Sequence, residues 1–124
     1  MKAKIQYTEV PMLLTHAAAN VAGPWTAIEN PSELGLIVPP LPTPSSVFVQ
    51  VARDAIGTGA AILVDKAGTQ VLLLASSSGS LAVSSNELGA ILGYPFMRVV
   101  LGTNQNFDVT FYLMQKVVAG DPYA

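Results

Sequence analysis

The stretch LIVPPLPTPSSVFVQVARDAIG, residues 36–57, joins a proline-rich segment directly to an alternating apolar run. Four prolines stand within residues 39–44. Proline fixes φ and has no N–H to donate to a sheet ladder, so this segment is extended and is not a central strand. In the run that follows, Val47, Val49 and Val51 share one face, which is typical of a half-buried strand. The stretch therefore predicts a stiff crossing from one sheet or edge to another, leading into a strand.

Short apolar segments with turn-like residues between them continue along the chain from Trp25 onward, and Gly68 stands at a turn between two of them. Turn signals about every 8–12 residues are typical of a β-sandwich or a barrel. Residues 85–95 are expected to contain a single helical turn, with Ser85 or Asn86 as its cap. The predicted strands are WTAIE, LGLIV, VFVQVAR, AAILVD, QVLLLA, LAVS, FMRVVLG and FDVTFYLMQKV. This pattern predicts an all-β, antiparallel fold of about eight strands.

The N-terminal residues differ from the rest of the chain. Pro11 and Pro24 bracket MLLTHAAANVAG, which has little regular apolar periodicity. The segment is expected to be either a short helix at residues 13–21 or an extended arm that becomes ordered against a partner. Since 124 residues suit one domain, we predict an N-terminal arm at residues 1–24 and one β-sandwich domain at residues 25–124.

The composition points to association. Hydrophobic residues make up 51% of the chain and charged residues only 11%, whereas soluble domains usually carry about 25% charged residues. We therefore expect another chain to cover part of the surface, the alternative being a monomer that relies on Ser, Thr, Asn and Gln for its polar face. The net charge is −2 and the six basic residues are scattered, which argues against nucleic acid as a partner.

We expect neither a targeting segment nor disulfide chemistry from this sequence. The chain has no cysteine and therefore no disulfide framework or cysteine-based zinc site. No apolar run approaches the roughly 20 residues that span a bilayer, so no membrane partner is expected. Polar residues and Pro11 interrupt the apolar stretch near the N-terminus, so a signal peptide is not expected either.

No catalytic constellation stands out, and the chain is not expected to be an enzyme. His16 is the single histidine and is expected to face solvent or an interface, because a general base needs a supporting partner. Asp54 and Asp65 border one candidate hairpin and offer a possible calcium site, but ordinary turn acids are the favoured interpretation. No cofactor-binding, metal-binding or catalytic residue is predicted.

The aromatic and basic residues have alternative interpretations. Trp25 and Tyr94 are candidates for a carbohydrate-binding platform, although a core position for Trp25 is favoured. Arg53 is expected in a surface pair with Asp54 or in a partner contact. Arg98 lies inside an apolar strand, which an edge position or an interface salt bridge would explain.

The order of segments resembles a group of small tailed-phage structural proteins. In that group a strand ending in proline leads through a linker to F-Q-x-S-x-D-G, then a polar hairpin, a G…Y-x-(K/R)-(V/I)-x-x-G strand, N-Q and a last apolar strand. The resemblance covers roughly residues 25–117, and Ala52 and Ala55 depart from it where the pattern has Ser and Gly. The matching residues are Val38, Pro39, Phe48, Gln50, Asp54, Tyr94, Arg98, Gly102, Asn104 and Gln105.

The resemblance implies a jelly-roll sandwich of the galactose-binding type and a capsid decoration, or cement, protein. Its implied partners are the major capsid protein and further copies of the chain as a homo-oligomer. Its implied location is the capsid surface of the virion, after synthesis in the host cytoplasm. A carbohydrate-binding module, possibly on a virion, is the alternative function. The expected partner contacts are Met12, Leu13, Leu14, Pro40, Pro42 and Arg53.

Overall fold

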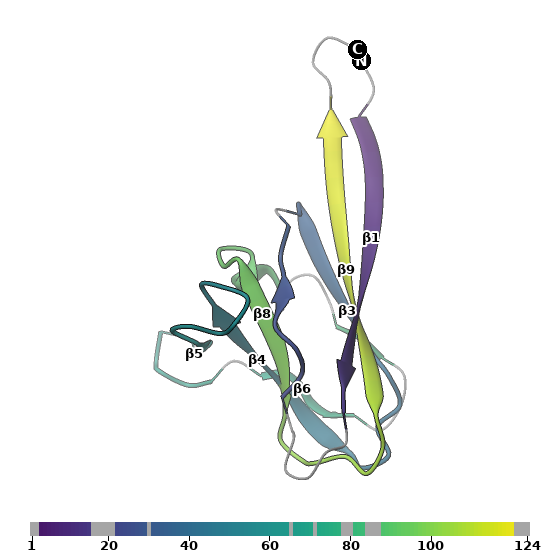
Figure 1. Cartoon of the computed structure of the whole chain (residues 1–124), viewed down its shortest axis with the longest axis vertical. Coiled ribbons are helices and arrows are strands. Elements are labelled where there is room, and N and C mark those ends of the chain that lie inside the picture. The colour runs from purple at the N-terminus through teal and green to yellow at the C-terminus, as the bar shows by residue number, and fades with distance from the viewer. Residues whose placement is uncertain are drawn as a thin grey trace.

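The computed structural model is a sandwich of two antiparallel sheets (Figure 1). It describes residues 3–15, 22–29, 31–64, 66–70, 72–77, 81–83 and 88–120. The strands are β1 (Ala3–Leu14), β2 (Thr26–Ala27), β3 (Glu33–Val38), β4 (Ser45–Ala52), β5 (Ala61–Ile62), β6 (Leu72–Ser77), β7 (Leu81–Val83), β8 (Phe96–Leu101) and β9 (Val109–Gly120), with a 3₁₀ turn η1 (Gly89–Ile91). Sheet A has the order β1-β9-β3-β7, and sheet B has the order β2-β8-β4, with β5 and β6 both on the free side of β4.

Strands β5 and β6 together occupy one strand position. Gln50 of β4 pairs with Ile62, and Phe48 pairs with Leu72 farther along the same edge. Between these pairs the chain leaves the sheet in a hairpin that has one bridge, from Val64 to Gln70. Gly68 adopts a φ of 82° at its turn, a conformation that glycine reaches without steric cost. The turn predicted at Gly68 is therefore confirmed. The hairpin, however, interrupts a single strand position beside β4 and does not join two neighbouring strands of the sheet.

The strand order is that of a jelly roll. When β5 and β6 count as one strand, sheet A contains strands 1-8-3-6 and sheet B contains strands 2-7-4-5. The pairs 1 and 8, 2 and 7, 3 and 6, and 4 and 5 are all antiparallel. Four such ribbons wrapped around one core make the eight-stranded jelly roll. The predicted jelly-roll-like sandwich is confirmed, and the barrel that the same spacing allowed is not formed.

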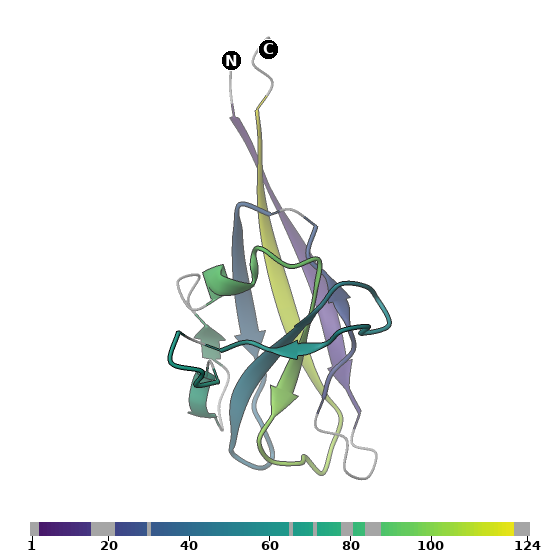
Figure 2. The same cartoon turned by 90° about the vertical axis from the view of Figure 1, so that its left-hand side faces the viewer.

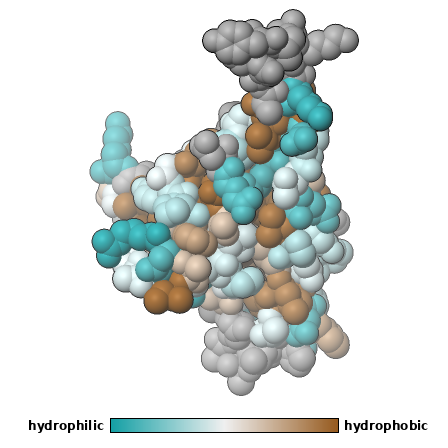
Figure 3. All heavy atoms as spheres, turned by 45° about the horizontal axis from the view of Figure 1, so that its top comes forward, coloured by the Kyte–Doolittle hydropathy of each residue, from teal (hydrophilic) through white to brown (hydrophobic). Residues whose placement is uncertain are grey.

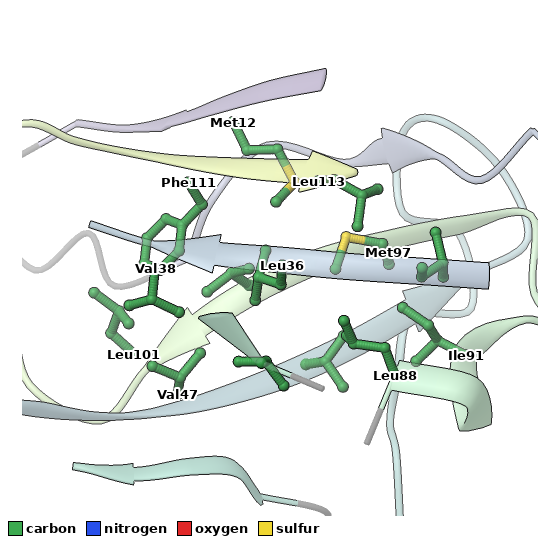
Figure 4. Close-up of a cluster of buried hydrophobic side chains, with 14 of the residues drawn as sticks. Met12, Leu36, Val38, Val47, Leu88, Ile91, Met97, Leu101, Phe111 and Leu113 are labelled. Carbon is green, nitrogen blue, oxygen red and sulfur yellow. The ribbon is translucent and has the colours of Figure 1, made fainter. Parts of the chain in front are cut away.

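The core lies between the sheets and follows the alternation of the strands. Val47, Val49 and Val51 all point inward and are buried, as their spacing predicts. From sheet A, Phe111 and Leu113 of β9 and Met12 of β1 point into the core opposite these valines, as Figure 4 shows. Other large apolar side chains exposed by less than 2% include Leu14, Leu36, Val38, Leu88, Ile91 and Met97.

The proline-rich segment crosses between the two sheets. It connects β3 of sheet A to β4 of sheet B, which confirms the predicted crossing. Leu41, between two prolines, is buried in the core, while Pro40 and Pro42 are exposed. The segment therefore follows the sandwich surface and is held to it by one apolar side chain.

The N-terminal segment requires a correction. Residues 3–14 form β1, which pairs in continuous register with β9 from Ala3–Gly120 to Leu14–Val109. This part of the predicted arm is thus one of the two longest strands of the sandwich, and Leu13 and Leu14 do not begin a helix. Residues 16–21 lie outside the described residues. The interpretation failed because Pro11 was taken as a boundary, whereas an edge strand tolerates proline.

The β1–β9 ribbon extends beyond the rest of sheet A. Pairing of β3 with β9 ends at Glu33–Lys116, so residues 117–120 pair only with β1. In Figures 1 and 2 this ribbon stands clear of the sandwich body. The N-terminal half of β1 therefore has a neighbour on one side only and no opposing sheet.

Candidate interaction surface

Sheet A presents an apolar outer face to solvent. Because side chains alternate along a strand, Met12 and Leu14 point to the core and the odd-numbered residues of β1 point outward. Ile5 is 55% exposed and Tyr7 is 65% exposed. We define the outer face of sheet A as Ile5, Tyr7, Glu9, Pro11, Leu13, Glu33, Gly35, Ile37, Thr110, Tyr112, Met114, Lys116 and Val118.

The strand register arranges these side chains in rows. Ile5 pairs with Val118, which is 47% exposed, and both belong to the free part of the ribbon. Pro11 pairs with Tyr112, which also pairs with Ile37 of β3. Figure 3, with the ribbon tilted toward the viewer, shows hydrophobic residues interleaved with hydrophilic ones along it. The outer face therefore combines apolar contact area with separate polar positions.

A shallow depression of about 220 Å³ lies on this face. Tyr7, Met114 and the glycine at position 35 line it. At its polar side the Lys116 ammonium lies 3.3 Å from a Glu33 carboxylate oxygen, and both side chains are partly exposed. Such a site can accept an apolar side chain from a partner and offer both charges at its rim, but these groups do not form a nucleophile-and-base arrangement.

Trp25 lies on the outer side of sheet B. The Arg98 guanidinium stacks 4.5 Å from the Trp25 ring centroid, and Arg98 Nε donates to Gln50 Oε1 at 2.8 Å. A Cβ added at Gly57 would lie 2.3 Å from the indole nitrogen, so the loop backbone covers the ring edge. Trp25 is therefore neither the predicted core plug nor a bare platform for a sugar ring, because Arg98 covers a face of it.

Of the two explanations offered for Arg98, the edge position is wrong. It lies on β8, which has β2 on one side and β4 on the other, so it does not occupy an edge strand. The alternation of β8 points Arg98 outward between buried Met97 and Val99. Its charge is accommodated by the aromatic ring and the Gln50 amide oxygen.

Asp54 organises the loop after β4. Its Oδ1 accepts hydrogen bonds from the backbone N–H groups of Thr58, at 2.9 Å, and Ile56, at 3.1 Å. These donors, Thr58 first, hold the pKa of Asp54 below its ordinary value. Arg53 beside it is exposed and lies against Gly59. Asp54 thus has the role of a turn acid, while Asp65 lies outside the described residues.

The predicted contact residues are distributed over different elements. Met12 and Leu14 are each only 1% exposed and cannot contact a partner, because the inward face of β1 places them in the core. Leu13, 49% exposed, lies on the outer face of sheet A. Pro40 and Pro42 are exposed on the crossing between sheets, and Arg53 is exposed after β4. Tyr94 is exposed near η1, and His16 lies outside the described residues.

Sequence analysis missed the residues that form the depression. Tyr7 and Ile5 belong to AKIQYTEV, where apolar and polar residues alternate. That alternation and the β-branched and aromatic residues are the signal for a half-exposed strand. Met114 belongs to the predicted strand FDVTFYLMQKV, but only the pairing of β1, β9 and β3 brings it beside Tyr7.

Among the described residues, no group of three histidine, aspartate or glutamate side chains is placed to hold a metal ion. In the same part of the chain, no helix is long and apolar enough to cross a membrane. Comparisons with known proteins found no matching family model, no matching curated sequence and no matching solved structure.

Proposed function

We propose that this chain is a non-enzymatic structural protein that decorates a phage head and binds through the outer face of sheet A. The observation that carries the proposal is the set of large apolar side chains on that face, led by Tyr7, Ile5 and Leu13. Several large exposed apolar side chains on one face of a domain are typical of a protein–protein interaction site. The low charge content of 11% agrees with a surface that is partly covered in an assembly.

The capsid as the partner rests on the order of motifs in the sequence. The jelly roll is a fold that viral capsid proteins use, but it also serves lectins and enzymes, so it supports the proposal only as an analogy. The contact mechanism is burial of apolar surface by many copies at once. Individually weak contacts are then sufficient, because simultaneous contacts multiply avidity.

Two measurements test the proposal. Immunogold electron microscopy of virions that carry the gene should place the chain over the head, and label on the tail or no label would contradict it. Purified chain should also bind to heads that lack it, and Tyr7→Ser should weaken that binding by about tenfold, the effect of losing one buried aromatic contact. Ile56→Ser is the matched control, because Ile56 is 84% exposed in the loop after β4.

Carbohydrate binding is the second candidate, and the depression favours it at Tyr7 rather than at Trp25 or Tyr94. Tyr7 offers an exposed ring beside the depression, and Glu33 and Lys116 provide groups that can hydrogen-bond hydroxyls. A glycan array with Tyr7→Ala as the control distinguishes the two functions. Binding that is lost in Tyr7→Ala supports the carbohydrate module, and absence of binding at millimolar sugar eliminates it.

A further inference from the structure

The free edge of β1 is the longest strand edge without a neighbour in the described part of the chain. β1 is the terminal strand of sheet A and has 12 residues. The other terminal strands β7 and β2 have three and two, and β5 and β6, which share the fourth edge, have two and six. A long open edge presents unpaired N–H and C=O groups that can pair with another strand. Residues 4–9 are all exposed, and residues 3–6, which pair with β9 beyond the end of β3, belong to the part of the ribbon that stands clear of the sandwich in Figures 1 and 2.

Pro11 shows which backbone groups face this edge. Proline has no N–H, and within a strand it is placed where that position faces away from the neighbouring strand. In an antiparallel pair, the N–H and C=O of one residue point to the same side, and the side alternates from residue to residue. The register of β1 with β9 is continuous, so Ile5, Tyr7 and Glu9 share the side of Pro11. Their backbone groups face the free edge.

We propose that two copies of the chain pair antiparallel through residues 3–9 of β1, with the two-fold axis at Gln6. The proposal rests on the assembly of many copies in the proposed function, and it specifies how two of these copies pair. In this register Ile5 pairs with Tyr7 of the second copy, and both present their N–H and C=O groups to each other. The paired segment ends before Pro11, whose missing N–H would interrupt a longer ladder.

The side chains agree with this pairing. On the outer face, this register continues the rows of β1 and β9. One row across four strands then contains Val118 and Ile5 of the first copy, followed by Tyr7 and Lys116 of the second copy. Cross-strand aromatic and β-branched pairs of this kind stabilise a sheet. On the inner face, the two Gln6 side chains lie opposite each other, where amide groups can both donate and accept.

Charge favours the antiparallel orientation. Lys4 and Glu9 lie near the two ends of the paired segment. Antiparallel pairing places Lys4 of each copy opposite Thr8 and Glu9 opposite Ala3 of the other, whereas parallel in-register pairing would place Lys4 against Lys4 and Glu9 against Glu9. Like charges opposite each other destabilise a strand pair.

Cysteine cross-linking tests the register directly, because the chain has no cysteine of its own. Gln6→Cys should form a disulfide dimer under mild oxidation, since a residue on the two-fold axis lies opposite itself. Lys4→Cys and Thr8→Cys should each fail alone, because self-partners would be offset by about 13 Å along the strand, beyond disulfide reach. Mixed together, these two variants should form a heterodimer. Ile56→Cys, exposed in a distant loop, gives the background rate.

If Tyr7→Cys or Thr8→Cys alone cross-links faster than Gln6→Cys, the register centred on Gln6 is wrong. If every variant cross-links only at the background rate of Ile56→Cys, the two copies do not pair through this edge.

A proline variant tests the backbone hydrogen bonds. Ile5→Pro removes a donor that faces the free edge, so it leaves the ladder to β9 intact and removes two hydrogen bonds from each dimer. It should weaken self-association in analytical ultracentrifugation about tenfold relative to Ile5→Ser, which keeps the N–H. Equal dimerisation by these two variants would overturn the proposal. If Ile5→Pro is monomeric but binds phage heads as well as Ile5→Ser does, the proposed function stands without this dimer. Loss of head binding by Tyr7→Ser in a chain that still dimerises separates the two proposals in the other direction.

Discussion

Gln105 and Thr43 form a two-point hydrogen-bonded contact between the proline-rich crossing and the loop before β9. The Thr43 N–H donates to Gln105 Oε1 at 2.9 Å, and Gln105 Nε2 donates to the Thr43 carbonyl at 2.8 Å. Gln105 is 2% exposed, and its Nε2 also donates to the carbonyl of Thr103. Pro42 and Pro44 have no N–H groups. Between residues 42 and 44, therefore, Thr43 alone has a backbone N–H that can donate a hydrogen bond. One buried amide therefore substitutes for strand pairing where the prolines prevent it.

Gln105→Leu should destabilise the fold by about 1–3 kcal/mol, because the part-buried Thr43 N–H would lose its acceptor. Chemical denaturation followed by far-UV circular dichroism measures the free energy of unfolding. Asn104→Leu is the matched control, since Asn104 is exposed and exposed substitutions usually change stability by less than about 0.5 kcal/mol. Equal effects of the two variants would show that the Gln105 contact has no stabilising role.

Gly35→Ala and Gly57→Ala should have opposite effects on stability. At position 35 the new Cβ would lie 3.7 Å from Met114 Cβ, an ordinary contact, so a gain of about 0.5–1 kcal/mol is expected from the lower entropy of the unfolded chain. At position 57 the φ of 82° costs a non-glycine residue about 1–2 kcal/mol, and the Cβ would also displace the Trp25 ring. Thermal unfolding compares them, and a lower melting temperature for Gly35→Ala would contradict the predicted fit.

Arg98→Ala should expose Trp25 and shift its fluorescence emission to longer wavelength. The chain has one tryptophan, so the signal is unambiguous. The variant should also lose about 0.5–1 kcal/mol from the cation–π contact. Arg98→Lys keeps the charge but loses the planar stacking. Its emission wavelength should lie between those of the unchanged chain and Arg98→Ala. Emission that is unchanged in Arg98→Ala would show that the stacking is absent in solution.

The loop after β4 should loosen at acidic pH. The N–H groups of Thr58 and Ile56 keep the pKa of Asp54 below its ordinary value of 3.8. A carboxyl whose pKa is lower in the folded state stabilises that state above its unfolded pKa, and the contribution disappears as pH falls through the folded pKa. An NMR titration of the Asp54 carboxyl should have its midpoint below 3.8, with the Thr58 amide shifting in parallel. A midpoint at or above that value, or an identical Thr58 shift in Asp54→Asn, would contradict this role.

The candidate surface was less accessible to sequence analysis than the fold. Leu13 was predicted as a contact residue and is exposed, but its neighbours Met12 and Leu14 are buried. Three consecutive apolar residues do not show which of them point inward, and a shift of one residue in register exchanges the two faces. The pairing partner decides, and here it is β9, about 100 positions away in the chain.

The amino-acid sequence by itself determined the all-β class, the alternation that buries Val47, Val49 and Val51, and the crossing at the prolines. These features depend on local properties, namely the period of two along a strand and the missing N–H of proline. Only the tertiary structure decided that β1 belongs to sheet A, that β5 and β6 share one edge, and that Tyr7 lies beside Lys116 and Glu33. Those relationships depend on pairings between distant segments, whose hydrogen bonds and packing are not encoded by any short stretch of the chain.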